Sequence, residues 1–202
     1  MIRERLRAST VYHRQWTAER AGGPFDPAVF LDRDGVINRD SPDYITSFDA
    51  FEFLPGSIEA IARLKAAGFT VFVITNQSAI HRGLLTLSTL AEIHRHLLRS
   101  VEDAGGHIQE IYYCPHRPDE NCICRKPLPA MILSASRKYG LDLSSAIMIG
   151  DKGSDIACGQ NAGCGLTIQV GDAPFSPQDP VADHRTTDLF DAVHWILSHY
   201  AP

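Results

Sequence analysis

Two aspartates, Asp32 and Asp34, stand two positions apart directly after a short apolar run, residues 28–31. The run has the composition of a buried strand, and side chains two positions apart in an extended chain point to the same side. One carboxylate is then placed to attack as a nucleophile while the other transfers protons. Aspartate and glycine are also common in turns, so the pair alone does not separate a catalytic site from a polar turn.

Further polar side chains follow the later apolar runs. Thr75 and Asn76 close the second run, Lys126 follows the third, and Asp151 closes the fourth. Because parallel strands end at the same edge of a sheet, we expect these groups to converge with Asp32. Phosphoryl transfer needs such a set: a nucleophile, a cation, a hydroxyl or amide donor, and a proton carrier. The carboxylates of Asp32 and Asp151 would hold Mg²⁺, which prefers oxygen ligands.

A second cluster of candidate ligands lies between residues 114 and 124. It consists of Cys114, His116, Cys122 and Cys124. Three thiols and one imidazole at this spacing predict a tetrahedral zinc site, and four protein ligands leave no open position, so we expect a structural role. The metal would fold a loop that has little apolar material of its own. The alternative is a flexible loop with unrelated thiols.

The elements that must position these groups follow from the apolar pattern. We expect strands at 28–31, 69–74, 108–113, 146–149 and 166–170, helices at 56–67, 86–104, 129–139 and 189–199, and a short helix capped by Ser154. Strands that alternate with helices predict a parallel sheet with helices on both faces, whose ligands bind beyond the carboxyl ends of the strands.

The length of 202 residues suits one well-buried domain, which we expect over 28–202 after an N-terminal arm, 1–27. The arm lacks the apolar segment of a secretory signal; an organelle-targeting peptide is the alternative, opposed by Glu4 and Glu19. The formal charge of −5 argues against a nucleic-acid partner. Apolar residues make up 44% of the chain without a run long enough to span a bilayer. We expect a cytoplasmic monomer.

Four segments in order resemble the signatures of the haloacid dehalogenase superfamily of phosphatases. They read Phe-Leu-Asp-Arg-Asp-Gly-Val-Ile-Asn at 30–38, Val-Ile-Thr-Asn-Gln-Ser at 73–78, Cys-Arg-Lys-Pro at 124–127 and Ile-Gly-Asp-Lys at 149–152. The resemblance covers residues 28 to 170 and implies a Rossmann-like three-layer sandwich. It implies that Asp155, shortly after the last segment, only orients the loop.

The same resemblance assigns roles to the polar groups. It implies that Asp32 is the nucleophile and Asp34 the general acid and base, while Thr75 and Lys126 hold the transferring phosphoryl group. It also implies that the magnesium ligands are Asp32, Asp151 and the backbone carbonyl of Asp34. These roles together describe a phosphatase that works through an aspartyl-phosphate.

The zinc-type loop, combined with the Asp-Arg-Asp-Gly-Val-Ile-Asn segment, resembles the heptose-1,7-bisphosphate 7-phosphatase branch and the related histidinol-phosphate phosphatases. The segment from Asp40 to Tyr44 favours the heptose branch, which implies a phosphorylated sugar as substrate. Histidinol phosphate or another small sugar phosphate is the alternative. A zinc-stabilised interaction module without catalysis is a further alternative, opposed by the complete set of catalytic residue types.

Substrate contacts are expected from short loops, because residues 35–74, between Asp34 and Thr75, already contain a helix and leave no room for a large cap domain. The candidate phosphate or substrate ligands are Asp40, Tyr44, Thr75, Asn76, Gln77, Ser78, Arg125 and Lys126. By resemblance, Arg125 recognises substrate. Arg125 or Arg82 could pair with a second phosphate, because a guanidinium matches phosphate geometry.

Two residues depart from the pattern of related enzymes. Ala79 stands where glycine is usual, and His81 where alanine is usual. Alanine does not adopt positive backbone angles as easily as glycine, so this loop could follow a different path. We assign His81 no catalytic role.

Overall fold

The computed structural model describes residues 27–171 and 180–200. Residues 1–26, 172–179 and 201–202 lie outside the described part, so the arm predicted over 1–27 and the domain predicted over 28–202 stay predictions. In the described part, none of the helices is both long enough and apolar enough to cross a membrane.

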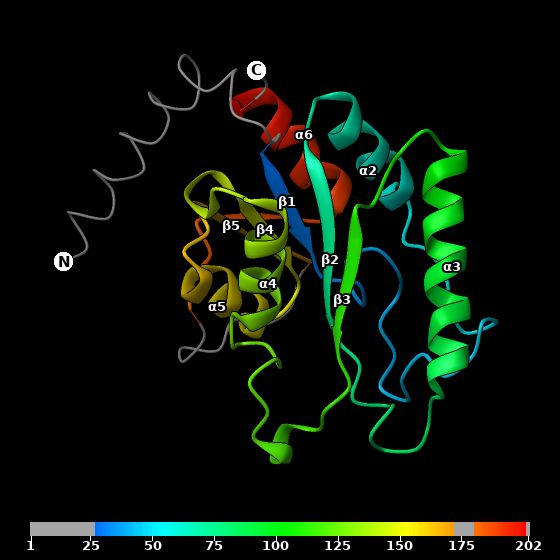
Figure 1. Cartoon of the computed structure of the whole chain (residues 1–202). Helices are drawn as coiled ribbons and strands as arrows, with labels where there is room; N and C mark the ends of the chain where they lie inside the picture. Colours follow the sequence, from blue (N-terminus) through cyan, green and yellow to red (C-terminus); the bar gives the residue numbers. More distant parts are fainter. Residues whose placement is uncertain (1–26, 172–179, 201–202) are drawn as a thin grey trace.

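Within the described residues, six parallel strands form one sheet in the order β3-β2-β1-β4-β5-β6. Figure 1 labels β1 to β5 of this sheet. Their bounds are β1 Ala28–Leu31, β2 Thr70–Asn76, β3 Glu110–Cys114, β4 Ile147–Gly150, β5 Leu166–Val170 and β6 His184–Thr186. The predicted parallel sheet is confirmed, and the first strand of the chain takes a central position between β2 and β4. The prediction missed β6, a short polar edge strand.

Helices cover both faces of the sheet (Figure 1). One face carries α2 Ser57–Ala66, α3 Leu87–Asp103 and α6 Leu189–Tyr200, and the other carries α4 Ala130–Tyr139 and α5 Gly153–Ala162. In β1, Val29 and Leu31 pack into the first core, whereas Ala28 and Phe30 pack into the second. A strand that is apolar on both sides requires this arrangement, and the predicted three-layer sandwich is confirmed.

The helix ends follow local capping chemistry. Thr86 caps α3 by accepting a hydrogen bond of 3.1 Å from the amide of Thr89. The expectation that Ser154 caps the short helix is wrong. Helix α5 begins at Gly153 after Lys152, and the Asp155 carboxylate accepts from the Lys152 amide at 3.0 Å. A carboxylate in the first turn satisfies a free amide better than a serine that lies inside the helix.

Short loops connect the strands to the helices at the carboxyl edge of the sheet. Residues 32–56 form an irregular loop that joins β1 to α2. A hydrogen bond of 2.9 Å from the Leu54 amide to the Ile37 carbonyl holds this loop together. Residues 77–86 join β2 to α3, and residues 115–129 join β3 to α4. Across 27–171, no additional domain is inserted, which confirms the expectation that a large cap is absent.

Candidate active site

The carboxyl ends of the strands surround one cleft of about 320 Å³. Every residue predicted to be catalytic or to bind substrate lines it, and these are Asp32, Asp34, Asp40, Tyr44, Thr75, Asn76, Gln77, Ser78, Arg125 and Lys126. Asp32 directly follows β1, Thr75 and Asn76 end β2, and Lys126 lies in the loop after β3. The fold therefore brings distant segments together because their strands end at one edge.

Lys126 lies buried at the centre of this cleft. Its ammonium group is 2.6 Å from Asp32 Oδ1 and 2.6 Å from Asp155 Oδ1, and it donates to the Ile74 carbonyl at 2.8 Å. Burial favours the neutral amine, but the charges of Asp155 and Asp32 outweigh it and raise the pKa of Lys126. Asp155 was expected only to orient the loop. Its contact with Lys126 shows that it also stabilises the charge of the lysine directly.

Asn76 contacts the backbone on either side of this lysine. The Lys126 amide donates to Asn76 Oδ1 at 3.1 Å, and Asn76 Nδ2 donates to the Lys126 carbonyl at 3.3 Å. The paired bonds hold the loop after β3 against the end of β2. In this structure, Asn76 therefore positions Lys126.

The carboxylate of Asp32 lies in a crowded, buried environment. Burial raises its pKa to about 8; Lys126 opposes this rise, and the charges of Asp155, Asp151 and Asp34 add to it. Burial likewise raises the pKa of Asp151 to about 6, against the neighbouring charge of Lys152. Carboxylates crowded in this way need a cation to remain ionised together.

The donor set fits a hard divalent cation. Carboxylate oxygens of Asp32, Asp151 and Asp155 all lie within 4.8 Å of one another. Asp151 Oδ1 is buried without a hydrogen-bond partner among the described residues, which leaves an acceptor available for an ion. Gly35 has φ +89°, and a Cβ added there would overlap the Asp151 carboxylate. The missing side chain of Gly35 therefore makes room for the carboxylate oxygens of Asp151. These observations agree with the predicted Mg²⁺ ligands Asp32 and Asp151.

Asp34 is held by Arg33 and Asn38, to which the sequence assigned no role, and by Gln77, which was predicted to bind phosphate or substrate. Arg33 donates to its two oxygens at 2.8 and 3.0 Å, Asn38 donates at 2.9 Å, and Gln77 at 2.6 Å. Burial would raise the pKa of Asp34, but the Arg33 charge and these hydrogen bonds together hold it below its ordinary value. Gln77 also donates to the Thr75 hydroxyl at 2.9 Å, which links the second carboxylate to the end of β2.

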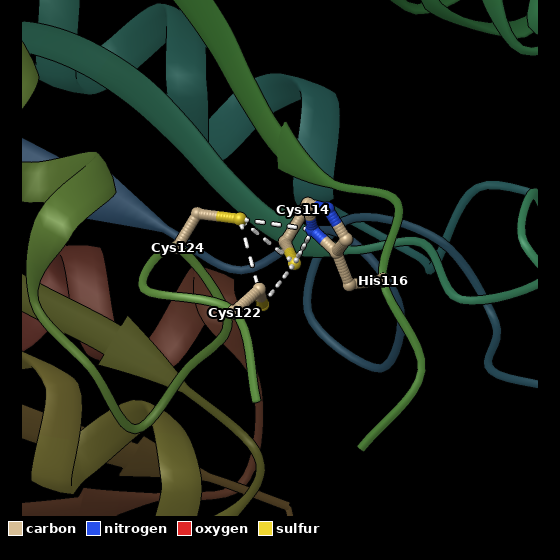
Figure 2. Close-up of side chains that lie close together, drawn as sticks. All are labelled: Cys114, His116, Cys122 and Cys124. Carbon is tan, nitrogen blue, oxygen red and sulfur yellow. Dashed lines mark hydrogen bonds between the residues drawn. The ribbon is translucent and has the colours of Figure 1, made fainter. Parts of the chain in front are cut away.

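The predicted zinc ligands converge at the end of β3 (Figure 2). Figure 2 shows their sulfur and nitrogen atoms directed at one another. The Cys114 sulfur lies 3.6 Å from that of Cys122 and 3.2 Å from that of Cys124, and His116 Nδ1 lies 3.2 Å from the Cys124 sulfur. In a tetrahedral site with zinc–sulfur bonds of about 2.3 Å, neighbouring sulfurs lie about 3.8 Å apart. The cluster therefore has the ligand types and close to the spacing that zinc requires.

The loop of residues 114–124 is attached to the turn after β2. The backbone amide of Gln77 donates to the Cys114 carbonyl at 2.7 Å. His81 Nδ1 lies 3.0 Å from a Glu120 carboxylate oxygen. The His81 ring also packs edge-on against that of His116, with 4.8 Å between ring centres. His81 therefore joins two loops that border the cleft.

Ala79 does not adopt the positive backbone angle that glycine takes up more easily than alanine. Within the described ranges, the non-glycine residues with positive φ are Tyr44 and Asn121. Ala79 is instead buried in the core beside α3.

The outer cleft is lined by cations. Arg125 donates to the His116 carbonyl at 3.1 Å, and the guanidinium carbon of Arg82 lies 5.7 Å from the centre of the Tyr44 ring. Lys152 pairs with Asp40 at 2.8 Å, so this predicted substrate ligand already has a partner. Tyr44 has φ 65°, an uncommon angle for a bulky residue and one often found at functional sites.

Comparisons with known proteins agree with this geometry. The pattern of the haloacid dehalogenase-like hydrolases matches residues 26–163. The D-glycero-beta-D-manno-heptose-1,7-bisphosphate 7-phosphatase of Pseudomonas aeruginosa is 48% identical over 136 residues, which cover 67% of this chain and 76% of the relative. The enzyme of the same name from Pseudomonas putida is 44% identical over 164 residues, 81% of this chain and 93% of the relative.

A solved structure has the same fold. The D,D-heptose 1,7-bisphosphate phosphatase from Bordetella bronchiseptica, crystallised with magnesium and phosphate, superposes with a TM-score of 0.78. It is 37% identical and covers 85% of this chain and 98% of its own. The family match over most of the chain and the identity to these relatives lead to one conclusion. The chain belongs to the haloacid dehalogenase-like hydrolase family.

Proposed function

We propose that the chain is a magnesium-dependent phosphatase that removes the 7-phosphate of D-glycero-D-manno-heptose 1,7-bisphosphate through an aspartyl-phosphate on Asp32. The observation that carries the proposal is the buried contact of Asp32 with Lys126, next to an Asp151 oxygen that has no hydrogen-bond partner within residues 27–171 and 180–200. This supplies a nucleophile, a fixed cation and a metal ligand in one place. The substrate is supported by the relatives, which are heptose-1,7-bisphosphate phosphatases.

In the first step, an Asp32 oxygen attacks phosphorus while the bond from phosphorus to the sugar oxygen breaks. Asp34 donates a proton to that leaving oxygen, so a sugar hydroxyl departs and phosphate stays on Asp32. An incoming phosphate brings negative charge close to Asp34, which raises its pKa toward the protonated form that this step needs. Thr75 and Lys126 would donate hydrogen bonds to the phosphoryl oxygens.

In the second step, water attacks the same phosphorus and the bond to Asp32 breaks. Asp34, now a carboxylate, accepts a proton from that water, and inorganic phosphate leaves. Asp32, Asp151 and the backbone carbonyl of Asp34 would hold Mg²⁺. The ion, when bound, offsets the repulsion between the Asp32 carboxylate and the phosphate.

We infer that the second phosphate of the substrate pairs with Arg125 or Arg82 at the outer cleft, because a guanidinium binds phosphate with two parallel hydrogen bonds. Arg125 directly follows the last zinc ligand, so a structural Zn²⁺ would place it. A cytoplasmic location for the enzyme stays a prediction. The absence of nucleic-acid and membrane partners and the monomeric state stay predictions.

The test is phosphate release with Mg²⁺ from heptose 1,7-bisphosphate, histidinol phosphate and fructose 1,6-bisphosphate. We expect the heptose bisphosphate to give the highest kcat/KM, with the 1-phosphate retained in the product by phosphorus NMR, and a chelator to stop turnover. Equal or faster turnover of histidinol phosphate would overturn the substrate assignment.

A substitution at Asp32 tests the formation of the aspartyl-phosphate. Asp32→Asn should lower kcat at least about 1,000-fold, because an amide oxygen does not replace the attacking carboxylate. Asp103→Asn, the same change on the exposed end of α3, should leave the rate unchanged. Wild-type turnover by Asp32→Asn would rule out the aspartyl-phosphate.

A further inference from the structure

Arg33 lies between the two predicted catalytic aspartates, and its side chain is completely buried. Burying a guanidinium costs free energy unless its charge and donors are satisfied. Here Nε donates to Asp34 Oδ1 at 3.1 Å, and one terminal nitrogen donates to both Asp34 oxygens at 2.8 and 3.0 Å. The fork of the guanidinium therefore fixes both the position and the plane of this carboxylate.

The other terminal nitrogen of Arg33 reaches helix α3. It lies 3.2 Å from Nε2 of His94, a residue 61 positions away in the chain. Arginine has only donors, so His94 Nε2 is the acceptor, and the histidine carries its proton on Nδ1. Burial, together with the Arg33 charge, lowers the pKa of His94 to about 3, in agreement with a neutral ring. Among the residues that the structure describes, Arg33 thus has its anionic partner in Asp34 and a neutral anchor in His94.

Without an anchor, a side chain as long as arginine has many rotamers, and a carboxylate bound to it shares that freedom. Helix α3 supplies one fixed end, because it packs into the core through Leu90, Ile93 and Leu97, around His94. The guanidinium also lies 5.8 Å from the centre of the Phe51 ring. The chain of contacts from α3 through His94 and Arg33 therefore ends on the proton-transferring group.

We propose that Arg33 and His94 are positioning residues that hold the Asp34 carboxylate in line for its proton transfers. The inference rests on the proposed function, because it concerns the role of Asp34 in that reaction. It predicts that changes at His94 act on the chemical step and leave substrate binding intact, since His94 does not line the cleft.

The experiment compares His94→Leu, His94→Gln and Arg33→Lys with the wild type on the heptose bisphosphate. We expect His94→Leu to lower kcat about 10- to 100-fold with KM within about twofold, because misplaced catalytic groups cost rates of this order. His94→Gln keeps an acceptor and should recover kcat to within about threefold of wild type. Arg33→Lys keeps the positive charge but loses the paired donors of the guanidinium, so its kcat and KM should resemble those of His94→Leu. His107→Leu, the same change at an exposed histidine, is the matched control and should leave both constants unchanged.

The outcomes are separable. A wild type that releases no phosphate from the bisphosphate overturns the proposed function and this inference with it. An active wild type with His94→Leu equal to His107→Leu, or with His94→Gln as slow as His94→Leu, overturns the inference alone. If His94→Leu does not fold, the Gln variant and nitrogen NMR of the wild-type imidazole decide. The inference requires the Nδ1-protonated tautomer, and an Nε2-protonated or charged ring at neutral pH contradicts it.

Discussion

Single residues in the cleft are placed by close contacts between segments far apart in the chain. Asp32 and Lys126 are 94 positions apart and lie 2.6 Å from each other. Gly35 shows the same closeness, because the space that its missing side chain leaves is bordered by the carboxylate of Asp151. Small changes of volume at this point therefore act directly on the candidate metal ligands.

Gly35→Ala should lower activity and Mg²⁺ affinity at least about tenfold, because the new methyl group displaces the Asp151 carboxylate. The positive φ of +89° should also cost about 1–2 kcal/mol of folding free energy. Gly68→Ala is the matched control, since Gly68 has φ +81° with no atom within 4 Å of an added Cβ. It should lose similar stability and keep full activity, which Mg²⁺ titration and thermal unfolding would measure. Equal activity of the two variants would contradict this reading.

The residue types of the site were predictable, whereas some contacts between them were not. Asp32, Thr75, Lys126 and Asp151 could be placed at one edge because each follows an apolar run. Arg33 and His94 could not, because arginine is normally exposed and a contact between residues 61 positions apart leaves no periodic signal.

At the scale of elements, the loop of residues 114–124 joins separate parts of the cleft border. It begins at the end of β3, contacts the turn after β2 through His81, and ends beside Arg125 and Lys126. Its own 3₁₀ turn, Pro118–Glu120, has no buried residue. The ligand cluster must therefore provide much of the order of this loop.

Cys122→Ser should remove bound zinc and lower Tm by at least about 5 °C, because the loop loses the metal that folds it. We also expect a higher KM for the bisphosphate, since Arg125 follows the last ligand. Metal content by atomic absorption and thermal unfolding are the measurements. Cys164→Ser, outside the cluster, should keep its zinc. Full zinc occupancy in Cys122→Ser would refute the proposed ligand set.

Long apolar elements were predictable to within a few residues, and short polar ones were not. Strand β1 coincides with its predicted range, 28–31, because both of its faces are buried and apolar. Strand β6 has only three residues, none of them apolar, and it forms through pairing with β5 at the sheet edge. The start of α5 depends on a tertiary position for Asp155, which local composition does not reveal.

For the whole molecule, the central place of β1 connects stability with the candidate site. This strand pairs with β2 on one side and β4 on the other, and all four residues are buried. The predicted nucleophile directly follows it. The most protected part of the sheet therefore carries the group whose position matters most for the proposed reaction.

Amide hydrogen exchange should show that protection is higher in the central strand β1 than in the edge strand β6. The amides of β1 should exchange only through global unfolding, whereas those of the edge strand β6 should exchange through local opening at lower free energy. Native-state exchange at increasing denaturant, followed by NMR, measures both. Equal protection of β1 and β6 would mean that the sheet opens as a single unit.

The described turns at the amino ends of the strands lie on the side of the sheet opposite the cleft. The turns from α2 to β2, from α3 to β3 and from α4 to β4 lie at that edge, and none contains a predicted site residue. An affinity tag, a fluorescent label or a linker to a surface inserted at Gly68 or Gly105 would thus point away from the cleft. Because all strands are parallel, the enzyme could be immobilised through these turns while its cleft faces the solution.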